Sequence, residues 1–179
     1  SQITLQPNET NSNDTFILHY GGFDDSNFGT DANLTLQPYS STIKKRILIK
    51  FDLSSIPAGS TIQSAVLGLK LVSAYAGEIT VNVHEITRSW TEAGATWNKY
   101  DGSTNWTTAG GDYDADVLDT VTLNTTVGFY EWDINEAVVQ GWLDTANNGL
   151  LLKGNDEAAS VNDKYFASSS DTTPEIDLT

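Results

Sequence analysis

Hydrophobic and polar residues alternate with a period of two along much of the chain. In residues 46–51 the odd positions are Ile, Ile and Phe, while the even positions are Arg, Leu and Lys. Residues 65–71 carry Ala and Leu at the odd positions, and residues 79–83 carry Ile and Val. Because successive side chains of a strand point to opposite faces, these runs predict β-strands with one buried face.

Shorter alternating runs predict further strands between turn signals. These weaker candidates are residues 3–5, 16–19, 34–36, 117–123, 129–132, 150–153, 165–168 and 176–178. Pro-, Gly- and Asn-rich turns separate the runs, at residues 38–40, 57–59, 76–77, 110–111 and 147–149. Many short strands with such spacing predict an all-β fold, an antiparallel β-sandwich or jelly roll.

One segment has helical spacing instead. Asp133 is a candidate N-cap, and Glu136 three residues later completes the pattern of a capping box. Apolar residues then follow along one face up to Trp142. We expect one short helix near residues 134–143, covering one end of a single domain that spans residues 1–179.

Several longer stretches resemble one known family. Residues 46–71 read RILIKFDLSSIPAGSTIQSAVLGLKL, a basic strand that leads through Phe-Asp-Leu-Ser and Ile-Pro-x-Gly to an alternating strand. VHEITRSWTEAGATWN at 83–98, WTTAGGD at 106–112, the 133–142 helix, NGLLLK at 148–153 and FASS at 166–169 extend the match. The chain closely resembles the DNRLRE domain family, although the family's naming motif is not present as such.

The resemblance implies a β-jelly-roll carbohydrate-binding module of secreted and surface proteins of bacteria and archaea. Such modules occur beside alginate lyases and in methanogen surface proteins related to disaggregatases. We therefore expect an extracellular or cell-surface location and a larger parent protein with adjoining domains, from which this domain is excised. The first roughly 40 residues match the family only loosely, so the resemblance assigns no role to the loop at residues 21–31.

Charge narrows the choice of partner. The chain has 24 acidic and 9 basic residues and a net charge of −15. That excess excludes nucleic acid and anionic lipid surfaces as broad electrostatic partners, and it favours Ca²⁺. No run approaches the roughly 18 apolar residues of a membrane helix, so no membrane insertion is expected. Without cysteine, disulfides and thiolate metal sites are excluded.

Basic residues are concentrated near one predicted strand. Arg46 and Lys50 share a strand face, and Lys70 and Lys153 belong to other predicted strands. If these strands lie in one sheet, the four side chains form a cationic stripe. Such a stripe suits the carboxylates of an acidic, uronate-containing polysaccharide, with Arg46 as a bidentate partner. The alternative is a solvated face balanced by nearby acids.

Aromatic residues supply candidates for stacking on sugar rings. Trp106 lies in a Gly- and Thr-rich segment with Tyr113 nearby, and we assign both to ligand binding. The alternative is that the loop aromatic is a packing lid. The other tryptophans are expected in the core: Trp90, Trp97, Trp132 and Trp142.

Alternating carboxylates provide a candidate calcium site. Asp112, Asp114 and Asp116 could wrap a hard cation that supports the fold, although the segment lacks the glycine and distal glutamate of an EF-hand. The alternative is an acidic surface loop. His19 and His84 are the two histidines, and we expect His84 to be structural. No catalytic motif is present, and no catalytic residue is assigned.

These observations favour a non-catalytic carbohydrate-binding module for an acidic polysaccharide, supported by Ca²⁺. The alternative is a structural or adhesive domain of a cell-surface or matrix protein that binds no sugar. A polysaccharide-cleaving enzyme ranks third.

Overall fold

The computed structural model describes residues 2–6, 12–169 and 175–179. In order along the chain, the elements are β1 (Ile3–Leu5), β2 (Ser12–His19), β3 (Asn33–Tyr39), β4 (Ile43–Phe51), β5 (Ala65–Ala74), β6 (Ile79–Glu85), β7 (Asp119–Leu123), β8 (Gly128–Ile134), α1 (Glu136–Asp144), β9 (Leu150–Gly154), β10 (Lys164–Ala167) and β11 (Glu175–Leu178). Each strand predicted from the sequence is present; β1 has the predicted ends, and the others differ by a few residues.

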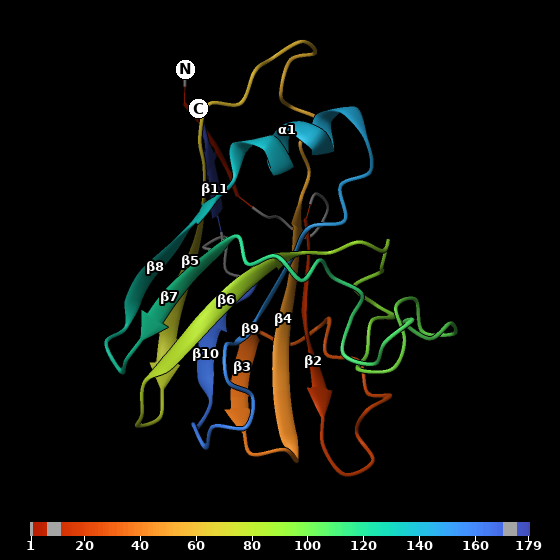
Figure 1. Cartoon of the computed structure of the whole chain (residues 1–179), viewed down its shortest axis with the longest axis vertical. Coiled ribbons are helices and arrows are strands. Elements are labelled where there is room, and N and C mark those ends of the chain that lie inside the picture. Colours follow the sequence, from red (N-terminus) through yellow and green to blue (C-terminus); the bar gives the residue numbers. More distant parts are fainter. Residues whose placement is uncertain (1, 7–11, 170–174) are drawn as a thin grey trace.

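All strand pairs are antiparallel, and one curled path connects them. The β5 sheet has the order β1-β11-β5-β10-β3, with β8 also paired to β5. The β4 sheet has the order β3-β4-β9-β6-β7, with β2 also paired to β4. Strand β3 belongs to both, because residues 33–36 pair with β10 and residues 37–39 with β4. Figure 1 shows the resulting curved layers, which confirm the predicted all-β sandwich.

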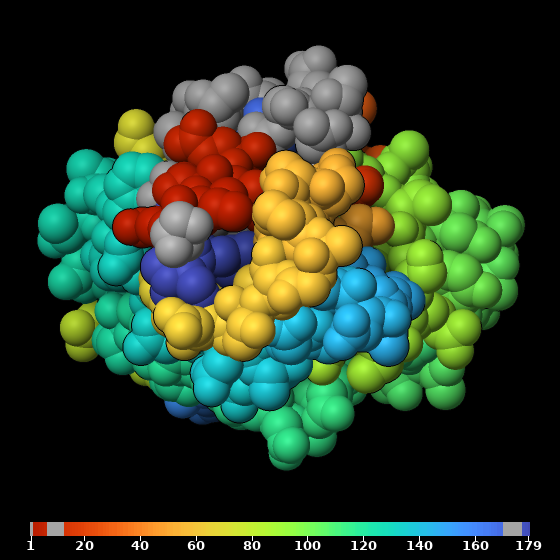
Figure 2. All heavy atoms as spheres, turned by 90° about the horizontal axis from the view of Figure 1, so that it is seen from above, coloured from red at the N-terminus to blue at the C-terminus, as the bar shows by residue number. Residues whose placement is uncertain are grey.

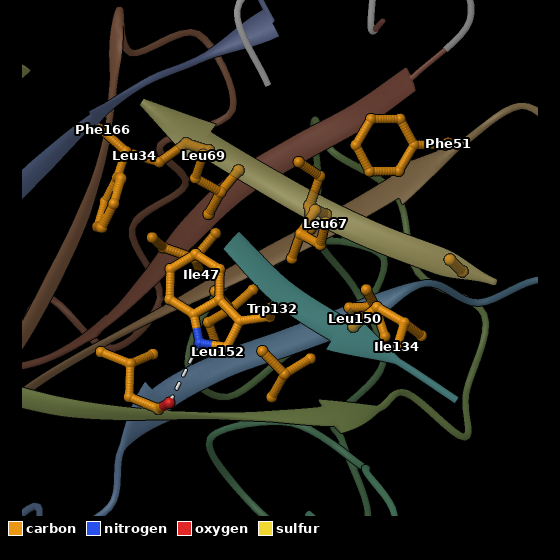
Figure 3. Close-up of a cluster of buried hydrophobic side chains, with 14 of the residues drawn as sticks. Leu34, Ile47, Phe51, Leu67, Leu69, Trp132, Ile134, Leu150, Leu152 and Phe166 are labelled. Carbon is orange, nitrogen blue, oxygen red and sulfur yellow. Dashed lines mark hydrogen bonds between the residues drawn. The ribbon is translucent and has the colours of Figure 1, made fainter. Parts of the chain in front are cut away.

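The main core lies between the two sheets. The alternating residues of 47–51 and 65–71 that were predicted to face inward are buried in it. Trp132 of β8 is fully buried among them, and its indole N–H donates to the carbonyl oxygen of Val81 at 3.2 Å, as the dashed line in Figure 3 marks. This bond satisfies the one polar group that Trp132 brings into the core.

A second hydrophobic cluster covers the outer face of the β4 sheet. Ile17, Leu48 and Leu151 are fully buried on this face. Their cover is the long segment 86–118, which contributes Ile86, Trp90, Ala95, Trp97 and Trp106. We call this group the outer cluster; it makes the β4 sheet a middle layer where the segment crosses it.

Helix α1 closes one end of the sandwich, as predicted. Its Val139 and Trp142 are buried in the main core, and Figure 1 shows it at the end from which β4 exits. The predicted cap was wrong: Asn135 is the N-cap, and its side chain accepts from the Ala137 N–H at 2.8 Å. Asp133 still belongs to β8, where it pairs with Val66. Within the described residues, no helix is long and apolar enough to span a membrane.

Candidate functional site

Arg46 is buried inside the outer cluster instead of lying on an exposed face. Its Nε donates to Glu157 Oε1 at 2.8 Å, its Nη2 to Glu157 Oε2 at 2.6 Å, and its Nη1 to the Gly110 carbonyl at 2.6 Å. The guanidinium also lies 4.6 Å from the Trp97 ring centroid. Burial raises the pKa of the Glu157 carboxyl, but the hydrogen bonds and charges of Arg46 and Lys153 together outweigh burial and hold this pKa below its usual value. The N–H donors of the Arg46 guanidinium are therefore already bonded to Glu157 and Gly110.

The other two residues of the predicted stripe, Lys153 and Lys70, do not form a common cationic surface with Lys50. The Nζ of Lys153 lies 3.3 Å from Glu157 Oε2 and 5.8 Å from the ring centroid of Tyr113, so Lys153 shares the acid of Arg46. Lys70 belongs to β5 and therefore to the other sheet. The predicted single cationic stripe is wrong, because segment 86–118 covers the β4 face and β5 lies across the core.

Lys50 has different surroundings from Arg46 although both belong to one strand. It is half-buried, and its Nζ lies 5.5 Å from the centroid of the Trp90 ring. None of the ion pairs within the described residues includes Lys50. Burial lowers the pKa of its ammonium below the usual value, since no acid compensates the lost hydration.

A cavity of about 840 Å³ opens beside Lys50 at the α1 end of the sandwich. One wall is the loop after β4, and the other is α1 with the segment that follows it; Figure 2 shows these two parts of the chain lying against each other. Its polar lining includes Asn13, Lys50, Asp52, Ser54, Ser60, Gln140, Asp144, Thr145 and Asn147. The mixture of one cation, two carboxylates, amides and hydroxyls suits a polar ligand.

Hydrogen bonds hold the walls of this cavity in place. Gln140 of α1 accepts from the Ile62 N–H at 2.8 Å and donates to the Ser60 carbonyl at 3.3 Å, which fastens the loop to the helix. Asn147 donates to the Phe51 carbonyl at 2.8 Å. Gly149 has φ +80°, and a Cβ there would lie 2.2 Å from the Ile49 carbonyl oxygen, so glycine lets this chain pass beside β4. The cavity is thus preformed.

Trp106 was a candidate for stacking on a sugar ring, but the structure places it in the outer cluster, where it packs as a buried lid. It is 4% exposed, and its indole N–H donates to the Thr96 carbonyl at 2.9 Å. Tyr113 is half-buried, with its ring centroid 4.9 Å from that of His84 and 5.6 Å from the Arg46 guanidinium. The four tryptophans predicted for the core are all buried.

Two of the three aspartates predicted to bind calcium, Asp112 and Asp114, accept hydrogen bonds within the protein. Asp112 accepts from Arg88 Nε at 2.6 Å and from the Thr107 and Thr108 N–H groups at 3.0 Å each. Burial raises the pKa of Asp112, but these bonds outweigh it and lower the pKa. Asp114 accepts from the Asp116 N–H at 2.9 Å. Across the described part of the chain, no three acids or histidines are grouped to hold a metal ion.

His84 is structural, as predicted. Its Nδ1 contacts the carbonyl oxygens of Asp114 at 2.9 Å and Asp116 at 3.1 Å. Burial lowers the pKa of the imidazole. The ring therefore anchors the returning part of segment 86–118 to β6.

Sequence reasoning found Lys50 but missed the cavity that it borders. The walls come from segments read only as turns, 57–59 and 147–149. A signal was available, since β4 and the segment before β9 lie next to each other once Ile49 pairs with Leu150. That pairing was not predicted, so the two turns were not placed at one end.

Comparison with known proteins agrees with this architecture. No curated protein matches the chain. The model of carbohydrate-binding module family 96 matches residues 6–179, which supports the predicted class of module but not the DNRLRE naming. Because the match extends over nearly the whole sequence, the chain belongs to carbohydrate-binding module family 96.

Proposed function

We propose that this module binds an acidic, uronate-containing polysaccharide without cleaving it, and that Lys50 contacts a carboxylate of the ligand. The observation that carries the proposal is Lys50 itself, a half-buried ammonium at a preformed cavity with no acid paired to it among the described residues. A carboxylate brought beside it would restore the electrostatic stabilisation that burial removes.

Three other cations on the β4 sheet support this assignment by contrast, because each already has an acidic partner. Arg46 and Lys153 share Glu157, and Lys45 pairs with Asp163 at 2.6 Å. A ligand carboxylate at those positions would have to displace an existing partner. At Lys50 it would add a partner without removing one.

Calcium support and an extracellular or surface location belong to the same proposal. Asp52 and Asp144 line the cavity together with Lys50, and their charges oppose an anionic ligand unless a cation offsets them. The described acids form no group of three that fits a metal ion. Binding therefore depends on Lys50, and calcium is varied as one condition of the experiment.

The experiment compares Lys50→Gln, Lys50→Arg and the wild type by affinity electrophoresis and calorimetry. The panel contains alginate, pectin and neutral glycans, each with calcium and with chelator. Lys70→Gln is the matched control, because Lys70 is also half-buried but lies on the other sheet and outside the cavity. We expect Lys50→Gln to weaken uronate binding roughly tenfold and Lys50→Arg to retain it.

Three results would contradict the proposal. Unchanged uronate affinity in Lys50→Gln would remove Lys50 from the site. Retention by no glycan would favour the structural or adhesive alternative, and release of reducing ends or unsaturated uronates would show an enzyme. Equal affinity with calcium and with chelator would contradict only the calcium part of the proposal.

A further inference from the structure

An exposed pair of aromatic rings lies in the loop that follows β2. The rings of Tyr20 and Phe23 are nearly parallel, with 6° between their planes and 6.2 Å between their centroids. Tyr20 is 46% exposed and Phe23 is 51% exposed. We call these two rings the aromatic platform. Neither residue contributes to the main core or to the outer cluster.

The loop holds the platform in a defined position. The Phe23 N–H donates to the Tyr20 carbonyl at 2.8 Å, and the Tyr20 N–H donates to Asp24 Oδ1 at 3.0 Å. Asp24 is fixed in turn by His19, whose Nδ1 lies 2.9 Å from Asp24 Oδ2. Gly22, which lies between Tyr20 and Phe23 along the chain, has φ +99°, a conformation that glycine adopts without strain. The two rings are therefore exposed on an ordered turn.

Polar groups lie in the same loop as the platform and in the segment that contacts this loop. Asp25, whose side chain is 56% exposed, lies 3.6 Å from Lys99 Nζ and accepts from Asn98 Nδ2 at 3.3 Å. The Asn98 N–H also donates to the Asp24 carbonyl at 3.2 Å, which connects segment 86–118 to this loop. Flat apolar faces beside hydrogen-bonding groups complement a pyranose ring, which has an apolar C–H face and a polar edge of hydroxyls.

We propose that Tyr20 and Phe23 form a second glycan contact, where a pyranose ring stacks on the aromatic platform. The ladder between β2 and β4 separates this contact from the Lys50 cavity, because His19 pairs with Lys44 at one end and Asn13 with Lys50 at the other. Six residues of strand correspond to about 20 Å. The inference rests on the proposed function only in that both require a glycan ligand.

The test measures glycan affinity for the double variant Tyr20→Ala/Phe23→Ala. The conservative variant Tyr20→Phe/Phe23→Tyr keeps both ring faces, and Tyr75→Ala removes an exposed tyrosine outside the platform. Melting temperature is followed for each variant, so that loss of fold is separated from loss of binding. The probes are alginate, pectin and neutral glycans at low and high salt.

We expect the double alanine variant to lose roughly tenfold in affinity, while the other two variants bind like the wild type. The loss should persist in high salt, because stacking is not screened, whereas the loss in Lys50→Gln should shrink. Wild-type affinity in the double alanine variant would overturn the platform, even where Lys50→Gln confirms the proposed function. Loss in the double variant with unchanged binding in Lys50→Gln would overturn the proposed function and leave the platform standing.

Discussion

Arg46 and Lys50 belong to one strand and one face, yet their partners give them different roles. Arg46 is enclosed by Glu157, Gly110 and Trp97, and its side chain is 9% exposed. The Lys50 ammonium lies over the Trp90 ring, and the cavity opens beside it. A charged residue that is buried and paired contributes to the folded state, whereas a half-buried one that lacks an acidic partner is suited to bind an anion.

Removing the Arg46 side chain should therefore destabilise the fold. Arg46→Ala leaves the Glu157 carboxylate buried without its main partner, which typically costs about 3–5 kcal/mol of unfolding free energy. Urea denaturation would measure this loss, with Lys70→Ala as a control expected to change stability by about 0.5 kcal/mol or less. An Arg46→Ala protein that unfolds at the wild-type urea concentration would show that the pair contributes no stability.

Asp14 offers a pH-dependent test at the same scale. Its carboxylate is buried and accepts from the Ser169 N–H at 2.6 Å and the Ser169 hydroxyl at 2.7 Å. Burial raises the pKa of Asp14, and these bonds only partly oppose it. The folded state therefore retains the proton to higher pH than the unfolded state, and wild-type stability decreases as pH rises through the folded pKa.

Asp14→Asn should be more stable than the wild type at neutral pH. The amide keeps the shape of the carboxylate, can accept from the Ser169 N–H and can donate to the Ser169 hydroxyl, while the buried charge is removed. Thermal unfolding followed from pH 7 to pH 3 should show the advantage shrinking as Asp14 becomes protonated in the wild type. A constant difference across this range would contradict the raised pKa.

At the scale of elements, the start of α1 shows how neighbouring strands limit a local signal. Asp133 and Asn135 are both good cap residues, but Ile134 pairs with Ala65 and is buried in the main core. The strand therefore continues through Ile134, and the helix begins after Asn135. The local sequence predicted the helix; the strand pairing that set its first turn was not readable from it.

Replacing Asn135, the observed cap, should destabilise the protein, whereas replacing Asp133, the predicted cap, should not. Asn135→Ala removes the acceptor for the Ala137 N–H, a loss of typically about 1 kcal/mol. Asp133→Ala is the matched control, since its N–H bond to Asp119 is made by the backbone, and we expect a change of about 0.5 kcal/mol or less. Chemical denaturation of both variants measures the change in unfolding free energy. A larger loss of stability in Asp133→Ala than in Asn135→Ala would show that Asp133 is the cap.

The strands could be predicted because alternation is a local property, but the cover over the β4 sheet could not. Leu48 lies between Arg46 and Lys50 on the face that was interpreted as polar. On the neighbouring strands, Leu151 pairs with Leu48 and Ile17 pairs with Arg46, and both are buried on the same face. Apolar residues at those positions were a sign that something covers this face. Which segment covers it depends on long-range packing, and so Arg46 and Trp106 were predicted to bind the ligand although both are buried.

At the scale of the whole molecule, a net charge of −15 opposes the approach of a polyuronate even though one cation is available to bind it. The two effects act over different distances. Repulsion by the net charge acts beyond contact, so it governs how often the ligand arrives. Attraction by Lys50 acts at contact, beside Trp90 and within the cavity, and so it governs how long the ligand stays.

Added salt should therefore accelerate association with alginate. The screening length falls from about 30 Å at 0.01 M salt to about 8 Å at 0.15 M, which removes most of the long-range repulsion. Stopped-flow measurements should show the association rate rising over this range equally in the wild type and in Lys50→Gln, while the dissociation rate is faster in Lys50→Gln. An association rate that falls with salt would mean that a local positive field steers the ligand, and the net charge of this protein would then be irrelevant to its encounter with an acidic polysaccharide.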